Sequence, residues 1–541
     1  MQRRKFLKST AIASAPLLFN KIPVMAAPNL QTENLQTMAD AAAQCGKILI
    51  IIELQGGVDG LTMVCPKDKW SELSAVRNNI LIKEDQILPL DNNPTTGLHP
   101  STPDLQKLYN EGKMMIVQGV SYDNPDYSHF RSNDILYAGS DSNQVFDTGW
   151  LGRALDSIYP NFPTGYPNAT MSDPLAVQIG SLLPFCLQGP NVNMGYCVTN
   201  PTELLDVLNG TPGPAPNSDY GTELTFLRLM KDQSNAYRGV LQNAYNVPYT
   251  HATSYPVPPK VNSLADQLKI VAKLINGGLT TPIYILNHGG NFDTHGNQVD
   301  PLDPREGDLP DLLTILSEAV GGFQADLKKM GKENLVTGMT HTEFGRRIKS
   351  NDSKGTDHGV AAPVLLFGAG LNTGSSAVLN EVQTATGMIG ASPTLPPNEP
   401  TVADDVPMQF DYRQVYTSIM QDWLCMSKAQ ADAALGKSYT KLPIFASTQL
   451  STPKFDNNSS FLTIYPNPVS NNQINIRFAT SLNDNIAVAV YNIQGVKVFD
   501  SKFVVNGNTL NFSINNRLSS GTYILEVVTN GASHTEKLLI L

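Results

Sequence analysis

The sequence predicts a large α/β domain followed by a small antiparallel β-sandwich. Three observations support this prediction: near-continuous apolar runs alternate with helix-spaced stretches, a polar passage follows them, and short alternating strands fill the C-terminal end. At 541 residues the chain is too long for one ordinary domain, so two or more folding units are expected.

Six apolar runs in the large region have the length and composition of buried strands. Such runs are typical of a parallel sheet that helices cover on both faces. The runs are Lys47–Leu54, Met114–Val120, Leu175–Gly180, Thr281–His288, Asn334–His341 and Ala362–Gly370. Apolar residues at helical spacing fill Thr222–Asn246, Asn262–Gly277 and Leu309–Gly331. We therefore expect an α/β domain over residues 28–446.

The C-terminal part of the sequence differs in composition and in its hydrophobic pattern. Residues 447–460 are rich in Ser, Thr, Pro and Asn, which is typical of a linker. Residues 461–541 contain short alternating strands separated by Gly and Asn-Gly turns. We expect them to form the small antiparallel β-sandwich.

Residues 1–27 have the features of an export signal. A basic start precedes an apolar stretch from Ala11 to Phe19 and small residues near Ala27, and the stretch is too short to span a membrane. The run after Gln2, with Arg3 and Arg4, resembles a twin-arginine signal; an ordinary Sec signal is the alternative. Either signal takes the protein out of the cytoplasm, and no later segment is apolar enough to be an integral membrane segment.

Charge and cysteine content exclude two classes of function. The net charge of -10 argues against nucleic acid as the main partner. The five cysteines form no CxxC pair and no zinc spacing. Cys186 and Cys197 could pair across a short loop, but cysteine is not expected to carry the chemistry.

Polar residues follow the predicted strands, where open α/β sheets bind their ligands. Asp59 follows the first run, and Ser128 follows the second and precedes a helical stretch. The later runs are followed or preceded by His288, Asp293, His295, His341, Glu343, Asp357 and His358. Carboxylate oxygens with a few imidazoles suit Zn, Mn or Mg better than a thiolate-bound metal. We expect several of these residues to hold metal.

Several motifs resemble a known family. LQGGVDGL, SHFRS, TGWLGR, FDTHGNQ, TEFGR and DHG are similar to motifs of the alkaline-phosphatase-like family catalogued as domain of unknown function 1501, over roughly Lys47 to Met426. The resemblance implies an alkaline-phosphatase/sulfatase-like sheet covered by helices on both faces. It also implies one or two divalent metal ions (Zn, Mn or Mg) around a nucleophile at a helix N-terminus.

The resemblance assigns roles to residues of this chain. Asp59 matches a ligand of the metal on the nucleophile side, and Ser128 matches the nucleophile. Asp293 and His295 match the second metal's ligands, although they stand two residues apart where four is usual. One alignment of the late motifs makes Asp357 and His358 a ligand pair. The preferred alignment makes Glu343 and His358 ligands and puts Phe344 where a His is usual.

The preferred alignment lacks one nitrogen ligand, which His341 or His129 would replace. Arg131 and Arg153 are candidates to hold an anionic substrate, because a guanidinium matches phosphate or sulfate oxygens. Each assignment has a plainer alternative: Asp59 as a turn residue, Ser128 as a helix cap, and the arginines as helix-surface residues. Trp150 is expected in the core.

A second resemblance covers the C-terminal region. Tyr465–Asn471, Val490–Val498, Leu518–Val527 and the closing KLLIL are similar to the C-terminal sorting domain of type IX secretion in Bacteroidetes-type bacteria. It implies export through the periplasm and outer membrane by the type IX machinery, removal of the tail, and release or attachment at the outer cell surface. A generic carbohydrate-binding sandwich is the alternative.

The leading functional hypothesis is a secreted or surface-attached, metal-dependent hydrolase of phosphate esters with Ser128 as nucleophile. Sulfate esters are less favoured, because SHFRS lacks the Cys/Ser-x-Pro-x-Arg pattern of a modified nucleophile. The alternative is a surface binding protein that keeps the fold without turnover. Phe344 and the close spacing of Asp293 and His295 favour that alternative.

Overall fold

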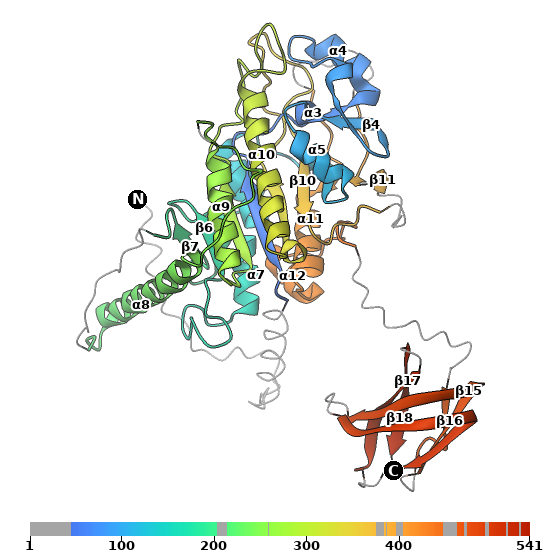
Figure 1. Cartoon of the computed structure of the whole chain (residues 1–541). Coiled ribbons are helices and arrows are strands. Elements are labelled where there is room, and N and C mark those ends of the chain that lie inside the picture. Colours follow the sequence, from blue (N-terminus) through green and yellow to red (C-terminus); the bar gives the residue numbers. More distant parts are fainter. Residues whose placement is uncertain are drawn as a thin grey trace, which may run out of the picture. The chain divides into compact units, whose positions relative to one another are not determined.

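The chain divides into two compact units, Met1–Ser447 and Thr448–Leu541 (Figure 1). The computed structural model describes residues 45–202, 214–257, 259–374, 383–385, 387–395, 404–446, 462–469, 473–492, 497–514, 518–529 and 532–540. The expected export signal (1–27) and linker (447–460) lie outside these ranges, so both stay predictions. Among the described helices, none has the length and apolar character to cross a membrane.

The first unit is built on a mixed sheet of ten strands. Its order is β11 (Gln383–Ala385), β12 (Met388–Ile389), β5 (Met114–Ser121), β10 (Ala362–Gly368), β9 (Val336–His341), β1 (Ile48–Glu53), β8 (Ile283–Asn287), β6 (Ala176–Ile179) and β7 (Tyr196–Val198), and β13 (Phe410–Asp411) pairs with β5. A separate small sheet holds β2 (Val64–Pro66), β4 (Asn93–Leu98) and β3 (Leu88–Leu90). All six predicted strand runs are strands of the large sheet.

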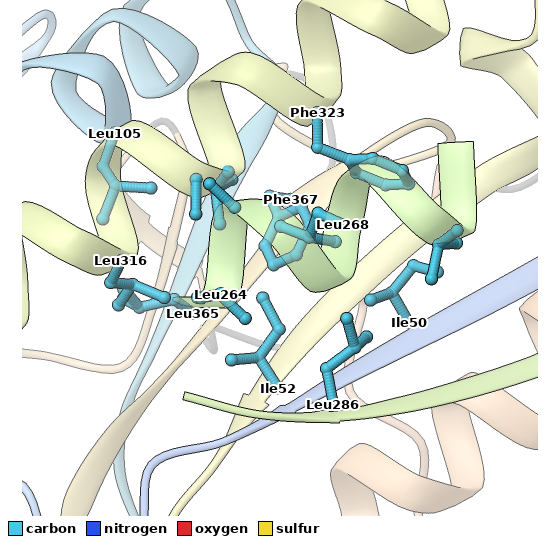
Figure 2. Packing of buried hydrophobic residues seen from close by; sticks show 14 of the residues in the cluster. Ile50, Ile52, Leu105, Leu264, Leu268, Leu286, Leu316, Phe323, Leu365 and Phe367 are labelled. Atoms are coloured by element: carbon cyan, nitrogen blue, oxygen red, sulfur yellow. The ribbon is translucent and has the colours of Figure 1, made fainter. Parts of the chain in front are cut away.

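Both faces of the sheet are covered, because successive residues of β1 point to opposite sides. Ile50 and Ile52 pack in the core beneath α5 (Pro103–Asn110), α9 (Ser263–Asn276) and α10 (Asp308–Lys329), as Figure 2 shows. Leu49 and Ile51 belong to a second core. That core includes residues of α6 (His129–Ala138), α7 (Trp150–Ile158), α11 (Tyr412–Ser418) and α12 (Lys428–Leu435). The expected sheet with helices on both faces is confirmed.

The other α-helices in the described part of the first unit are α3 (Gly60–Met63), α4 (Trp70–Arg77) and the long α8 (Asp219–Tyr245). α8, α9 and α10 match the three predicted helical stretches to within a few residues. Side chains that accept backbone N–H groups mark two of their starts: Ser218 caps α8 and Asn262 caps α9.

Two strands differ from the prediction of a parallel sheet: the short edge strand β11, which is antiparallel to β12, and the central strand β10. β10 runs antiparallel to both of its neighbours, β5 and β9. It therefore starts at the same edge of the sheet at which β9 ends. The connection between them, residues 342–361, stays at this edge, and residues before β10 lie beside residues after β9.

The second unit is an antiparallel sheet folded around one apolar core. Its strands are β14 (Leu462–Tyr465), β15 (Gln473–Asn492), β16 (Lys497–Ser513), β17 (Gly521–Thr529) and β18 (Ala532–Ile540). The first half of β15 pairs with β14 and its second half pairs with β17. Alternate residues at both ends of β15, Ile474 to Phe478 and Ile486 to Val490, belong to the core. The expected antiparallel C-terminal sheet is confirmed.

The cysteines pair differently from the possibility that the sequence raised. Cys45 and Cys425 form a disulfide across 380 residues of sequence. Cys186 and Cys197 are both free, so the possible pairing between them does not form. Cys186 is buried in the second core, whereas the Cys197 thiol donates to the carbonyl of Gly180. The sequence does not indicate the Cys45–Cys425 pairing, because these two residues are far apart in the chain and come together only in the folded protein.

Candidate metal centre

Side chains from three loops meet at the edge of the sheet where β5, β8 and β9 end. His129 opens α6 after β5, Asp293 and His295 follow β8, and His358 lies just before β10. The antiparallel direction of β10 is what places His358 here. The sequence prediction that strand-end residues converge is correct for these positions.

Three histidine side chains point one ring nitrogen each at the carboxylate of Asp293. Nε2 of His358 lies 3.0 Å from Oδ1 of Asp293, and Nε2 of His295 lies 3.1 Å from the same oxygen. Nε2 of His129 lies 3.3 Å from Oδ2. Ligand atoms of His129, Asp293 and His358 all lie within 4.8 Å of one another, so these three residues could hold a metal ion.

The other nitrogen of each ring, Nδ1, is fixed by a hydrogen-bond acceptor. Nδ1 of His129 lies 2.8 Å from Oε1 of Glu343, and Nδ1 of His295 lies 3.0 Å from Oδ1 of Asp357. Nδ1 of His358 lies 2.8 Å from the carbonyl oxygen of Tyr127. Two carboxylates and one carbonyl therefore orient the rings, as acceptors commonly do behind metal-bound histidines.

This arrangement fits a divalent cation. An imidazole that donates its Nδ1 proton and is neutral carries a lone pair on Nε2. Three such lone pairs facing one ionised carboxylate repel it unless positive charge lies between them. Ligands about 2.0 Å from a shared tetrahedral ion lie roughly 3.3 Å apart, close to the observed separations. The donor set of imidazole and carboxylate is one that zinc accepts.

A buried arginine holds Asp293 in its ionised form. The guanidinium Nη2 of Arg346 lies 2.6 Å from Oδ1 of Asp293. Partial burial alone would raise the pKa of Asp293, but the hydrogen bond and the positive charge of Arg346 act against it, and the pKa is lowered to about 2. Arg346 also donates to the carbonyls of Gly56, Gly57 and Phe292. It thereby ties the turn after β1 to the loop after β8.

That turn needs its two glycines. Gly56 and Gly57 have positive φ angles of 116° and 81°. A Cβ on Gly56 would lie 2.3 Å from the backbone nitrogen of Asp293, and one on Gly57 would lie 2.4 Å from the ring of Phe344. The N–H of Gly56 donates to Oε1 of Glu343 at 2.8 Å. The turn thus packs directly beneath the candidate metal centre.

Asp59 does not join this cluster. Its carboxylate is buried and forms an ion pair with Arg77 at 3.2 Å. It also accepts hydrogen bonds from Thr62 and Gln298, both at 2.7 Å. Burial opposes ionisation, but Arg77 and these donors lower the pKa of Asp59 below its ordinary value. The prediction of Asp59 as a metal ligand is corrected: in this structure Oδ2 accepts from Arg77, Thr62 and Gln298, and Oδ1 faces the Arg77 guanidinium rather than the histidine cluster.

The remaining predicted ligands lie around the cluster but contact it indirectly. Glu343 and Asp357 bind histidine Nδ1 atoms rather than pointing at the shared centre. His341 is buried, stacks on Tyr137 at 5.2 Å, and has no hydrogen-bond partner at Nε2. His288 is also buried, with Nε2 2.9 Å from the carbonyl of Leu312, so it is a structural residue.

Ser128 is the residue immediately before α6 and is exposed. Its hydroxyl makes no capping hydrogen bond. Its backbone N–H donates to Oδ1 of Asp126 at 2.7 Å. The alternative reading of Ser128 as a side-chain cap is therefore not supported, and the hydroxyl stands next to His129 at a helix N-terminus.

Arg131 and Arg153 do not face an anion site. Nη2 of Arg131 donates to the carbonyls of Ser142 and Gln144. Arg153 donates to the carbonyls of Ala138, Thr148 and Ala434. Because these guanidinium groups bind backbone carbonyls, the predicted role in holding substrate is corrected to a structural one. Trp150 is buried and stacks on Tyr416, as expected for a core residue.

Sequence reasoning missed two contributors to the centre, Arg346 and Tyr127, and gave a third, His129, only a secondary role. Arg346 stands in the TEFGR motif but was not given a role. Tyr127 acts through its backbone carbonyl, which no sequence pattern reveals. His129 was only a substitute for a missing ligand, although its position directly after Ser128, at the start of a predicted helix, was the available signal.

Comparison with known families bears on both regions. Residues 278–385 match the model of the family described as "Protein of unknown function (DUF1501)". Residues 463–541 match the "Secretion system C-terminal sorting domain". Both resemblances are confirmed. The sorting domain indicates export by type IX secretion to the cell surface or the medium. No curated protein matches the chain.

Solved structures with a similar arrangement include three proteins. One is from a study of glycosaminoglycan metabolism in Bacteroides thetaiotaomicron, with 10% identity over 85% of this chain and 90% of that one and a TM-score of 0.33. Another is a sulfatase from Pseudoalteromonas sp., with 11% identity, 93% and 88% coverage, and a TM-score of 0.32. The third is an alkaline phosphatase superfamily protein from Vibrio parahaemolyticus, with 9% identity, 86% and 90% coverage, and a TM-score of 0.30. At such TM-scores these likenesses carry no argument about the site.

Proposed function

We propose that the protein is an exported, divalent-metal-dependent hydrolase of phosphate esters. The observation that carries this proposal is the convergence of three histidine Nε2 atoms on Asp293, each ring held at Nδ1 by an acceptor. His129, Asp293 and His358 are the proposed ligands, and His295 lies beside them. Sulfate esters are a weaker candidate, because the SHFRS segment lacks the pattern of a modified nucleophile.

A bound divalent ion would supply Lewis acidity toward the ester oxygens and lower the pKa of a nearby hydroxyl. The residues of the chain prepare this site before any substrate arrives. Glu343 and Asp357 keep the Nδ1 protons of His129 and His295 on the outer side of each ring. Arg346 keeps Asp293 ionised, so its oxygens remain available to a cation.

Ser128 is the proposed nucleophile. Its exposed hydroxyl has no capping role, and it precedes the first turn of α6, whose N–H groups have no partners within the helix. These N–H groups and the helix dipole favour negative charge at this position. A serine oxygen attacking phosphorus there would form an O–P bond while the P–O bond to the leaving alcohol breaks, and the serine proton would pass to the departing oxygen. Water would then hydrolyse the phosphoserine, releasing phosphate and restoring the serine hydroxyl.

A second candidate is a surface binding protein without turnover. Two observations favour it: Arg131 and Arg153 bind backbone carbonyls, and Asp59 forms a buried ion pair with Arg77. Fewer groups are then available to bind ester oxygens than the family resemblance implies. Such a protein would keep the metal centre as a structural or ligand-binding element.

The test is a panel of phosphomonoesters, phosphodiesters and sulfate esters, with metal analysis of the purified full chain and of Ser128→Ala. We expect turnover of at least one phosphate ester by the wild type. The alanine variant should keep its metal and lose turnover, with a change in unfolding free energy below about 0.5 kcal/mol, because no cap bond is lost.

Three outcomes separate the candidates. Stoichiometric metal without turnover of any ester supports the binding protein. Full activity in Ser128→Ala would exclude the serine and leave water as the nucleophile. Wild-type chain that binds no divalent ion contradicts both metal-based candidates.

A further inference from the structure

A small cavity lies behind the candidate metal centre, under α6. It is lined by the ends of β5 and β9, the start of β10, and residues of α11. Most of the lining is apolar, and its polar side chains include Ser121, His341, Thr342 and Glu343. The cavity holds about 30 Å³ of space open to a water-sized sphere, which is room for roughly one or two water molecules.

His341 presents an unpaired polar atom in this region. The residue is only 7% exposed, and its Nε2 is buried without a hydrogen-bond partner. Tyr137 fixes the ring by stacking on it at an interplanar angle of 14°, and the Tyr137 hydroxyl is itself held by Glu53 at 2.6 Å. A buried nitrogen without a partner costs free energy, so an ordered water is the expected solution where room exists.

Glu343 offers a matching acceptor in the same wall. Its Oε1 is occupied by the N–H of Gly56 and by Nδ1 of His129. Its Oε2 has a contact only with the Thr342 hydroxyl, at 3.5 Å, which is too long for a strong hydrogen bond. A carboxylate oxygen can accept two hydrogen bonds, so Oε2 has capacity for another donor.

We propose that an ordered water in this cavity joins Nε2 of His341 to Oε2 of Glu343. His341 is then a positioning residue for the metal centre: it fixes Glu343, which orients the ring of His129. The site meets the requirements for a buried water, namely sufficient room and several polar partners. This inference rests on the proposed metal centre, because His129 is one of its ligands.

The experiment titrates Zn²⁺ into the metal-stripped full chain by calorimetry. His341→Phe keeps a flat ring on Tyr137 but removes the nitrogen. We expect it to weaken zinc binding about 10- to 100-fold, the range seen when partners behind metal ligands are lost. His341→Gln, whose amide can also bind the water, should restore most of the affinity.

The matched control is His99→Phe. His99 is also buried, and within the described part of the chain its Nε2 makes no hydrogen bond of good geometry, but it lies outside the proposed chain of contacts. This variant should bind zinc like the wild type. Melting curves of all variants identify any loss of affinity that comes only from unfolding, and ¹⁵N NMR of the His129 ring reports its Nδ1 hydrogen bond directly.

The outcomes distinguish the two claims. A wild-type chain that binds no zinc defeats the proposed function. Wild type that binds zinc, together with His341→Phe that binds equally tightly and leaves the His129 ring signals unchanged, overturns this inference alone. A high-resolution crystal structure with no water between His341 and Glu343 overturns it as well.

Discussion

Asp59 and Asp293 follow neighbouring strands of the same sheet, and their environments are opposite in kind. Both carboxylates bind a buried arginine, Arg77 for Asp59 and Arg346 for Asp293. The other partners of Asp59 are hydrogen-bond donors, Thr62 and Gln298, in a region closed to solvent. The other partners of Asp293 are imidazoles, and its side chain is 27% exposed.

The comparison shows that the neighbours of a strand-end aspartate decide its role. Around Asp59, hydroxyl and amide donors join the guanidinium, and every neighbour carries a proton toward the carboxylate. Around Asp293, imidazoles held at Nδ1 by acceptors can direct Nε2 lone pairs toward the same point, which suits a bound cation. Asp59 therefore serves the stability of the fold, whereas Asp293 forms the candidate metal centre.

The largest expected effect on stability comes from removing the buried carboxylate of Asp59. Asp59→Ala leaves Arg77 buried without its counter-charge, which should lower the free energy of unfolding by about 3–5 kcal/mol. Denaturant unfolding of the full chain measures this, and the transition of the C-terminal unit provides an internal reference. Zinc affinity of the folded variant should be unchanged; an unchanged stability with lost zinc binding would reverse the roles assigned to the two aspartates.

A smaller effect is expected at the acceptors behind the histidines. Glu343→Gln and Asp357→Asn keep side-chain shape but weaken the orientation of His129 and His295. Zinc affinity should fall about 10- to 100-fold for Glu343→Gln, because Glu343 is buried and serves a proposed ligand directly. The more exposed Asp357 should give the smaller loss. Equal affinity in both variants and the wild type would show that the rings need no such support.

Much of this fold could be predicted from sequence, because buried strands and amphipathic helices leave periodic patterns. The predicted strand ends also include Asp293 and His358, whose side chains the structure brings together. The direction of β10 could not be predicted, because an apolar run is compatible with a parallel or an antiparallel strand. Because β10 is antiparallel, His358 lies at the edge of the sheet that holds the candidate metal centre.

The sequence also could not predict which side chains contact each site residue. Asp59 matched a family motif, but its ion-pair partner, Arg77, lies in a helix with no recognisable motif. Glu343 was expected as a ligand, yet the structure places His129 between it and the centre. Such contacts depend on side-chain packing between distant segments, which a single sequence does not encode in a readable pattern.

The pH dependence of stability should have a defined sign. Burial lowers the pKa of His99, His288 and His341 to about 4, from 6.5 in the unfolded chain. Their contribution is fully present above pH 6.5 and is lost as the pH falls toward 4, because the unfolded state binds more protons.

Glu53 acts in the opposite direction. Burial raises its pKa to about 7, from 4.5 when unfolded, so its contribution is present below pH 4.5 and is lost as the pH rises through 7. Three histidines outweigh one glutamate, so the unfolding free energy of the metal-free chain should fall on acidification from pH 6.5 to 4. His99→Phe should make the decline shallower. A flat profile would contradict neutral, buried histidines.

The most direct test of the account is a calorimetric zinc titration of the metal-stripped full chain and three variants. The account predicts saturable binding by the wild type, loss of binding in Asp293→Ala and His358→Ala, and unchanged affinity in folded Asp59→Asn. Absence of binding by the wild type, or loss of binding in Asp59→Asn with retention in Asp293→Ala, would contradict it.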